Sequence, residues 1–189
     1  PPRRVRRRLG AAMSAILFGD PFDAETEMGP LPMSRQLEKV EGLIAKGCEE
    51  GATLVTGGRR PAHLERGFFI EPTVFGNVDN DSTIAREEVF GPVVSVIAAD
   101  DENHAVDIAN DTVYGLNASV FTDDIERAWT VSRQLRSGTV GHNSFKTDFG
   151  IAFGGFKQSG MGREGGLEGL QPYLEAKTVL LDAMPPSLT

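Results

Sequence analysis

The chain has 189 residues, of which 40% are hydrophobic and 24% charged, a composition typical of a globular domain. A single cysteine excludes an internal disulfide framework, and no apolar run reaches the roughly 18 to 20 residues that cross a bilayer. The net charge is −8 and the first ten residues carry five arginines, so the remainder carries −13 and would repel a nucleic-acid backbone. We therefore expect a cytoplasmic protein with no nucleic-acid and no membrane partner.

Apolar spacing and turn residues predict alternating helices and strands along the first half of the chain. Residues 34–50 predict a helix with Leu37, Val40 and Ile44 on its apolar side. Residues 52–58 predict a strand that ends in two glycines, and residues 67–75 are expected to be extended. The β-branched run over 92–99 predicts a strand covered on both faces.

The second half continues this alternation. Asp101 can cap a helix, residues 117–122 predict a strand, and residues 137–143 predict another. Between these two strands, Asp123 or Asp124 can cap a helix with an apolar side formed by Ile125, Ala128, Trp129, Val131 and Leu135. This order implies right-handed crossovers, and so an α/β fold with a largely parallel sheet and flanking helices.

The region after Asn143 has a different texture. Residues 144–166 are glycine-rich and predict a long ordered loop, and residues 175–183 predict a last strand. "GMGREG" (160–165) matches the dinucleotide fingerprint G-x-G-x-x-G, but a polar stretch precedes it where a buried strand is required. We therefore treat that match as accidental.

Neither a metal site nor a nucleophile can be assembled from the residue types present. The three histidines, His63, His104 and His142, lack the short spacing of zinc ligands, so no metal is expected. Cys48 falls near the carboxyl end of its predicted helix, where the helix dipole and two following glutamates disfavour a thiolate. Cys48 is therefore predicted to be a structural and not a catalytic residue.

The most informative stretch is "REEVFGPVVSV", residues 86–96. Two adjacent carboxylates, Glu87 and Glu88, precede the ring of Phe90 just before a predicted strand. A ring face beside a carboxylate would suit a nucleoside, because the ring packs on a planar base and the carboxylate accepts hydrogen bonds from hydroxyls. The alternative is that Glu88 is a turn residue and Phe90 belongs to the core. The residues alone leave both readings open.

This stretch resembles the Glu-Glu-Ile-Phe-Gly-Pro-Val signature of the aldehyde dehydrogenase superfamily. Further resemblance covers "FGDPFDAETEMGPL" (18–31), "GATLVTGG" (51–58), "GFFIEPTVF" (67–75), "ANDTVYGLNASVFT" (109–122), "SGTVGHN" (137–143) and "AFGGFKQSGMGREGGLEGLQPYLEAKTV" (152–179). The order and spacing are similar to the family from about residue 15 to residue 181, whereas the arginine-rich start fits poorly.

The resemblance implies oxidation of a small-molecule aldehyde to a carboxylic acid with NAD or NADP as acceptor. In that family a cysteine thiolate adds to the aldehyde, a hydride leaves, and a water activated by glutamate hydrolyses the thioester. By position, Glu88 resembles the carboxylate that holds the nicotinamide-side ribose, and Phe90 the ring that packs on the nicotinamide. Four residues fall in the segment that lines the aldehyde entrance in the family: Asn143, Phe145, Phe149 and Phe153.

The resemblance also implies that essential parts lie outside these residues. The family's nucleophilic cysteine, its general-base glutamate and its pyrophosphate loop belong to segments without a counterpart here, so no catalytic residue is expected in this chain. Residues 1–170 resemble the end of the catalytic domain, and residues 171–189 an oligomerisation strand and tail. We expect a chain that is inactive alone and forms a homo-oligomer through residues 176–181; a non-catalytic assembly module and a residual nucleoside-binding fragment are the alternatives.

Overall fold

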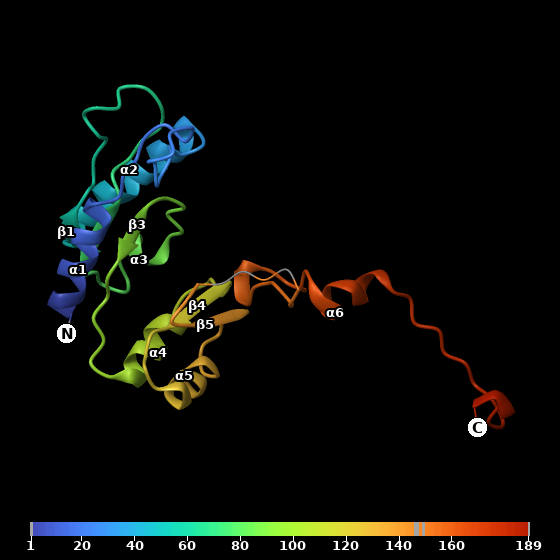
Figure 1. Cartoon of the computed structure of the whole chain (residues 1–189). Coiled ribbons are helices and arrows are strands. Elements are labelled where there is room, and N and C mark those ends of the chain that lie inside the picture. The colour runs from blue at the N-terminus through green and yellow to red at the C-terminus, as the bar shows by residue number, and fades with distance from the viewer. Residues whose placement is uncertain (1, 146–147, 149, 189) are drawn as a thin grey trace. The chain divides into compact units, whose positions relative to one another are not determined.

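The computed structural model describes residues 2–145, 148 and 150–188, and divides into two compact units between Ile108 and Ala109. Its first unit contains α1 (Pro2–Ser14), α2 (Ser34–Glu49), β1 (Thr53–Thr56), β2 (Thr73–Gly76), α3 (Thr83–Arg86) and β3 (Val93–Ser95) (Figure 1). The helix α4 (Glu102–Asn110) crosses the division. Every helix among the described residues is too short or too polar to span a bilayer.

The sheet of the first unit has the order β1-β2-β3, with β1 antiparallel and β3 parallel to the central strand β2. Phe75 of β2 packs against α2, whereas a Cβ added at Gly76 would meet the side chain of Arg6 on α1. Because successive strand residues face opposite sides, α1 and α2 cover opposite faces of the sheet. The core cluster consists of Leu37, Val40, Ile44, Ile70, Phe75, Val78 and Ile84.

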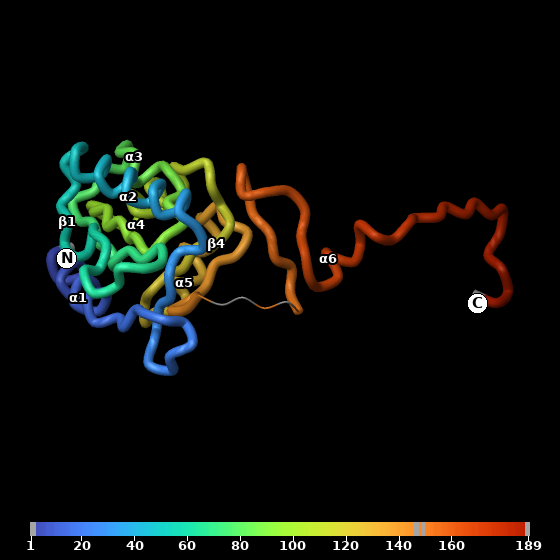
Figure 2. Tube along the Cα trace, turned by 90° about the horizontal axis from the view of Figure 1, so that it is seen from above, coloured from blue at the N-terminus to red at the C-terminus, as the bar shows by residue number. Residues whose placement is uncertain are grey.

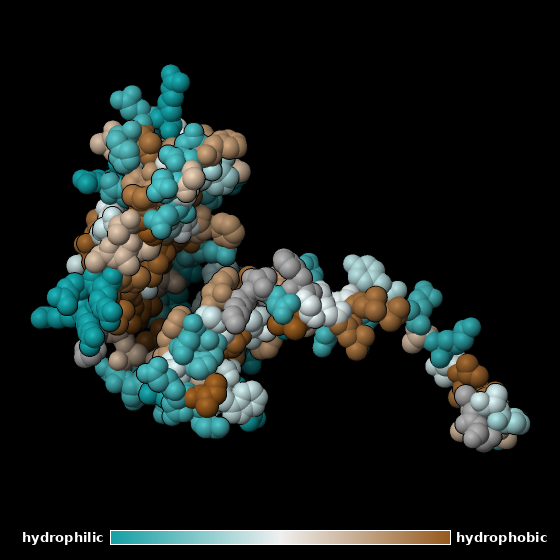
Figure 3. Space-filling model, viewed as in Figure 1, coloured by the Kyte–Doolittle hydropathy of each residue, from teal (hydrophilic) through white to brown (hydrophobic). Residues whose placement is uncertain are grey.

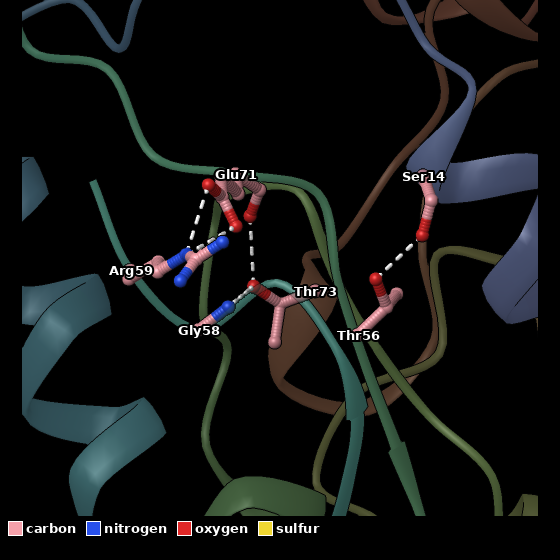
Figure 4. Close-up of polar contacts among 6 residues, drawn as sticks. All are labelled: Ser14, Thr56, Gly58, Arg59, Glu71 and Thr73. Atoms are coloured by element: carbon pink, nitrogen blue, oxygen red, sulfur yellow. Dashed lines mark hydrogen bonds and ion pairs between the residues drawn. The ribbon is translucent and has the colours of Figure 1, made fainter. Parts of the chain in front are cut away.

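The start of β2 is fixed by a fully buried threonine (Figure 4). The Thr73 hydroxyl donates to the Glu71 carbonyl at 2.8 Å and accepts from the Gly58 amide at 2.9 Å. The neighbouring Gly57 has a φ of 73°, and a Cβ added there would lie 2.3 Å from the Pro72 carbonyl oxygen. Gly57, the first of the two glycines that end the predicted strand over 52–58, is therefore needed for this close approach.

The strand pairings of the described chain are consistent with the predicted largely parallel sheet, and the sheet of the first unit differs from the prediction in the exposure of one strand. One of its strand pairings, β1 with β2, is antiparallel. The run over 92–99 forms only the short strand β3, which pairs with β2 alone, and Val94 is 37% exposed. The expectation that both faces of this strand are covered is therefore wrong for the first unit, since the face that carries Val94 is open to solvent.

The second unit contains β4 (Asn117–Val120), α5 (Ile125–Ser132) and β5 (Thr139–His142), in which α5 joins two parallel strands as predicted. The Asp124 carboxylate caps α5 by accepting from the amides of Glu126 and Arg127. Ala128 and Val131 of α5 are buried, but Ile125 and Trp129 are 62% and 61% exposed. The apolar side predicted for this helix is therefore only partly covered, because the described part of the unit provides too little surface to cover all of it.

The chain continues through α6 (Gly166–Leu170), which is labelled in Figure 2. The described residues of this part also form the short 3₁₀ helices Lys157–Ser159, Gln171–Tyr173 and Pro186–Leu188. The strand predicted over 175–183 is not formed within the described chain, where this segment has no ladder partner. A strand exists only when a neighbour accepts and donates its hydrogen bonds. Hydrophobic side chains therefore lie at the surface of this segment (Figure 3). Leu180 is 90% exposed. The predicted boundary between the catalytic-domain part (1–170) and the oligomerisation strand and tail (171–189) lies inside the second unit. That division stays a prediction.

Candidate functional site

The turn between α3 and β3 presents Glu88 and Phe90 to solvent. Both residues are exposed, and 73% of the Phe90 surface is accessible. Phe90 has a φ of 54°, in the left-handed region that costs an ordinary L-residue about 1–2 kcal/mol. A bulky residue persists in that region only when its surroundings hold it there. The exposed aromatic ring is therefore a supported feature of the turn.

That support comes from one face of α2. The Gln36 side-chain amide donates to the carbonyls of Val89 and Phe90, each at 2.9 Å, and the Lys39 ammonium donates to the Glu88 carbonyl at 2.6 Å. Val40, the residue after Lys39, packs closely on the turn. A Cβ added at Gly91 would lie 2.7 Å from the Cγ2 atom of Val40. Gln36, Lys39 and Val40 share this face because residues three and four apart are neighbours on a helix.

The helix that precedes the turn is anchored by Glu50, directly after α2. The Glu50 carboxylate accepts hydrogen bonds from the Thr83 amide and hydroxyl, both at 2.7 Å, at the start of α3. These two hydrogen bonds, assisted by the nearby Lys46 ammonium, lower the pKa of Glu50 below its usual value of 4.5. Both ends of the 83–91 segment are thus tied to α2 and the residue that follows it.

The turn has the chemistry that a ribose and a planar base require. Among the described residues, no hydrogen bond or ion pair occupies the Glu88 carboxylate, which leaves its oxygens available to accept from a vicinal diol. The Phe90 ring offers an uncovered apolar face on the same turn. The residues present therefore fit the nicotinamide-ribose end of NAD or NADP. Sequence reasoning missed Gln36 and Lys39, although both share a helix face with the predicted core residue Val40.

Asn143 joins the ends of β4 and β5 in the second unit. It has a φ of 50°, a conformation that asparagine tolerates better than most residues. Its side-chain oxygen accepts from the Thr122 amide at 2.9 Å, and its side-chain nitrogen donates to the Thr122 carbonyl at 2.8 Å. The amide of Asn143 is thus engaged in holding the turn, and its place in an aldehyde entrance remains a prediction.

The other predicted entrance residues lie beyond this turn. Phe145 is 73% exposed, and Phe149 lies outside the described residues. Phe153 is half-buried and exchanges two backbone hydrogen bonds of 2.7 Å with Glu164. It lines a pocket of about 480 Å³ together with Gly154, Gly155, residues 159–165 and Tyr173. The entrance residues belong to the second unit, whereas Glu88 and Phe90 belong to the first.

Cys48 lies where the sequence predicts, near the carboxyl end of α2, and its side chain is exposed. Glu49 and Glu50 follow it, and both contact the Lys46 ammonium at 3.6–3.7 Å. No cluster of potential metal ligands occurs in the described ranges. The site residues predicted from the sequence therefore lie in two places, the turn that carries Glu88 and Phe90 and the region that begins at Asn143.

The model of the aldehyde dehydrogenase family matches residues 3–179, a range that includes the arginine-rich start previously expected to fit poorly. A 3-succinoylsemialdehyde-pyridine dehydrogenase from a Pseudomonas species is 48% identical over 87% of this chain and 35% of its own length. A betaine aldehyde dehydrogenase from Brucella melitensis is 47% identical over 95% of this chain and 37% of its own length.

Solved structures give the same result. An aldehyde dehydrogenase from Mycobacterium tuberculosis in complex with NAD⁺ is 49% identical, with a TM-score of 0.90 over 95% of this chain and 38% of that one. Betaine aldehyde dehydrogenase from Staphylococcus aureus in complex with NAD⁺ is 40% identical, with a TM-score of 0.90 over 97% and 38%. The chain belongs to the aldehyde dehydrogenase family, and it spans little more than a third of the length of these relatives.

Proposed function

We propose that this chain forms the part of an aldehyde dehydrogenase that holds the nicotinamide end of NAD or NADP and lines the aldehyde entrance. The observation that carries the proposal is the braced turn, which presents the unengaged Glu88 carboxylate beside the exposed ring of Phe90. The NAD⁺ complexes of similar structures support a nicotinamide cofactor. The bound cofactor would supply the acceptor for the hydride that leaves the aldehyde carbon.

Glu88 would accept hydrogen bonds from the ribose hydroxyls, and Phe90 would pack on the nicotinamide and limit its rotation. Phe145, Phe149 and Phe153 would provide an apolar lining for the body of the aldehyde, with Asn143 at the base of their segment. The thiolate that attacks the aldehyde and the carboxylate that activates water would come from parts of the family fold outside these 189 residues. Cys48 takes no part, and the chain alone is expected to be inactive.

The test is fragment complementation. The purified chain is assayed for NADH formation from betaine aldehyde, alone and after co-expression with the segment of the Brucella relative that this chain does not match. We expect NADH only from the combination, a loss of at least about tenfold in Glu88→Gln, and no change in Cys48→Ser. NADH formation by the Cys48→Ser chain alone, or a combined activity indifferent to Glu88→Gln and Phe90→Ala, would refute the proposal.

A second candidate function is assembly. Within the described chain, the segment over 176–181 pairs with no strand, and it carries exposed hydrophobic side chains, among them Val179 at 64% and Leu180 at 90%. Such a segment can add as a strand to the sheet of another subunit. Light scattering should then show an oligomer that is lost when residues 174–189 are removed, and a concentration-independent monomer of the whole chain would exclude this role.

A further inference from the structure

The glycine-rich region contains a segment, residues 153–159, that is tied along its length to the loop 110–116. We call residues 153–159 the closing segment. The Phe156 amide donates to the Gly115 carbonyl at 2.8 Å and the Gln158 amide to the Val113 carbonyl at 2.9 Å. In the opposite direction, the Gly115 amide donates to the Ser159 hydroxyl at 2.9 Å. Two segments about 40 residues apart in sequence therefore form one ordered layer in the second unit.

Lys157 completes this attachment with its side chain. The half-buried ammonium donates to two carbonyls, that of Asn110 at 2.8 Å and that of Thr112 at 2.9 Å. Asn110 is the last residue of α4, so the cation lies at the negative end of the helix dipole. A charged donor to a carbonyl makes a stronger hydrogen bond than a neutral one does.

Asn110, one of the two residues whose carbonyls accept from Lys157, also makes hydrogen bonds with its side chain. The Asn110 side chain donates to the Gln134 carbonyl at 2.8 Å and accepts from the Arg136 amide at 2.7 Å, which fixes the connection between α5 and β5. Lys157 and Asn110 together therefore join three elements: the end of α4, the approach to β5, and the closing segment.

The backbone of Lys157 is held in a conformation that an L-residue rarely adopts. Its φ is 55°, in the left-handed region where glycine would be free of strain, although glycines are abundant on both sides. An L-residue in this conformation points to a constraint imposed by the surrounding structure. The two hydrogen bonds of the ammonium are such a constraint, and a glycine could not make them.

The first residue of the closing segment is Phe153, one of the predicted entrance residues. A Cβ added at Gly138, just before β5, would lie 1.7 Å from the Gly154 carbonyl oxygen, so the backbone after Phe153 is pressed against the start of that strand. A small displacement of the closing segment would therefore shift Phe153 and the chain that precedes it.

We propose that Lys157 is a positioning residue, whose ammonium holds the closing segment against residues 110–112 and thereby sets the place of Phe153 at the aldehyde entrance. The inference rests on the proposed function for the entrance, but the attachment itself is a property of this chain alone.

The experiment measures amide hydrogen exchange on the full chain for Lys157→Met, Lys157→Arg and the control Arg66→Met, which changes an exposed cation in the first unit. In Lys157→Met we expect the Phe156 and Gln158 amides to exchange at least about tenfold faster, while the Thr139 amide, which donates to the Leu116 carbonyl, is unchanged. Lys157→Arg should restore part of the protection, and the control should match the unaltered chain. Unchanged exchange in Lys157→Met, equal acceleration at Thr139, or failure of arginine to restore protection would overturn the proposal.

A second readout joins the attachment to the entrance. In the complemented enzyme, Lys157→Met should raise KM for the aldehyde several-fold while KM for NAD stays constant, and equal changes in both would contradict a role at the entrance. Hydrogen exchange is measured without cofactor or aldehyde, so it does not depend on the proposed function. If Lys157→Met accelerates exchange but the complemented enzyme is inactive, the result counts against the proposed function and not against the role of Lys157.

Discussion

Replacement of Gln36 by leucine tests whether α2 holds the turn that carries Glu88 and Phe90. Leucine has a similar volume but no donor, so the carbonyls of Val89 and Phe90 each lose a hydrogen bond of 2.9 Å. A typical hydrogen bond contributes about 0.5–1.5 kcal/mol, so the loss is about 1–3 kcal/mol. The left-handed backbone of Phe90 costs about 1–2 kcal/mol, a comparable amount. Without Gln36, Phe90 is therefore expected to leave this conformation.

The assay is amide hydrogen exchange at two sites that depend on the turn. The Val93 amide donates to the Gly91 carbonyl, and the buried Thr73 amide donates to the Pro92 carbonyl, both at 2.8 Å. A loss of about 1–3 kcal/mol corresponds to an acceleration of about 5- to 150-fold, since each 1.4 kcal/mol is tenfold. The matched control is Arg35→Leu, an exposed neighbour on the same helix, which should leave both rates unchanged.

A double substitution separates the hydrogen bonds from the backbone strain. Asparagine tolerates the left-handed conformation, so Phe90→Asn should reduce the strain and make the effect of Gln36→Leu smaller. Unchanged exchange at Val93 and Thr73 in Gln36→Leu would refute the reasoning, as would an effect of the same size in both backgrounds.

Three further changes have clear expectations. Gly91→Ala should destabilise the first unit by about 1–3 kcal/mol in urea unfolding, because the added Cβ would lie 2.7 Å from the side chain of the buried Val40. The control Gly42→Ala lies at an open helical position and should stabilise the unit by up to about 1 kcal/mol. Equal effects of the two substitutions would be inconsistent with overpacking at Gly91. Glu50→Gln should lower stability at neutral pH and lose this effect as the pH falls below 4.5. The lowered pKa of Glu50 favours folding fully while the carboxylate is ionised in both states, and the gain is lost as the folded carboxylate becomes protonated. A pH-independent difference between the two proteins would contradict this. Asn143→Ala should accelerate hydrogen exchange of the Thr122 amide, because the Asn143 side chain accepts a hydrogen bond from it. Asn143→Gly should do the same, although glycine relieves the strain of the left-handed backbone at this position. Unchanged exchange in both variants would show that the side-chain hydrogen bonds contribute nothing.

Local patterns were sufficient for the predictions that depend on neighbours in sequence. The spacing of Leu37, Val40 and Ile44 identified the buried face of α2, and Asp124 was among the two caps predicted for α5. The position of Cys48 at a helix end followed from the same periodicity. The motif around Glu88 and Phe90 indicated the family, which the comparisons confirm.

Other features depended on which segments meet in space. Periodicity assigned Ile125 and Trp129 to the apolar side of a helix, but only packing determines how much of that side is covered. The run over 176–181 has strand-forming residues and remains without a strand partner in the described chain, because pairing requires a second backbone. Asn143 was predicted to line the aldehyde entrance, a role that stays a prediction. Its observed hydrogen bonds with Thr122 join the ends of two strands across 21 residues of sequence, a contact that exists only in the folded chain.

The sequence by itself determined the family, the α/β class, and the candidate carboxylate and ring, since these depend on residue types at short, regular spacings. Only the tertiary structure decided how these groups are held. Gln36 reaches carbonyls more than 50 residues away, and Lys157 reaches the end of a helix 47 residues before it. Backbone carbonyls are present at every residue and leave no signature in sequence, so the side chains that bind them become recognisable only when the chain is folded.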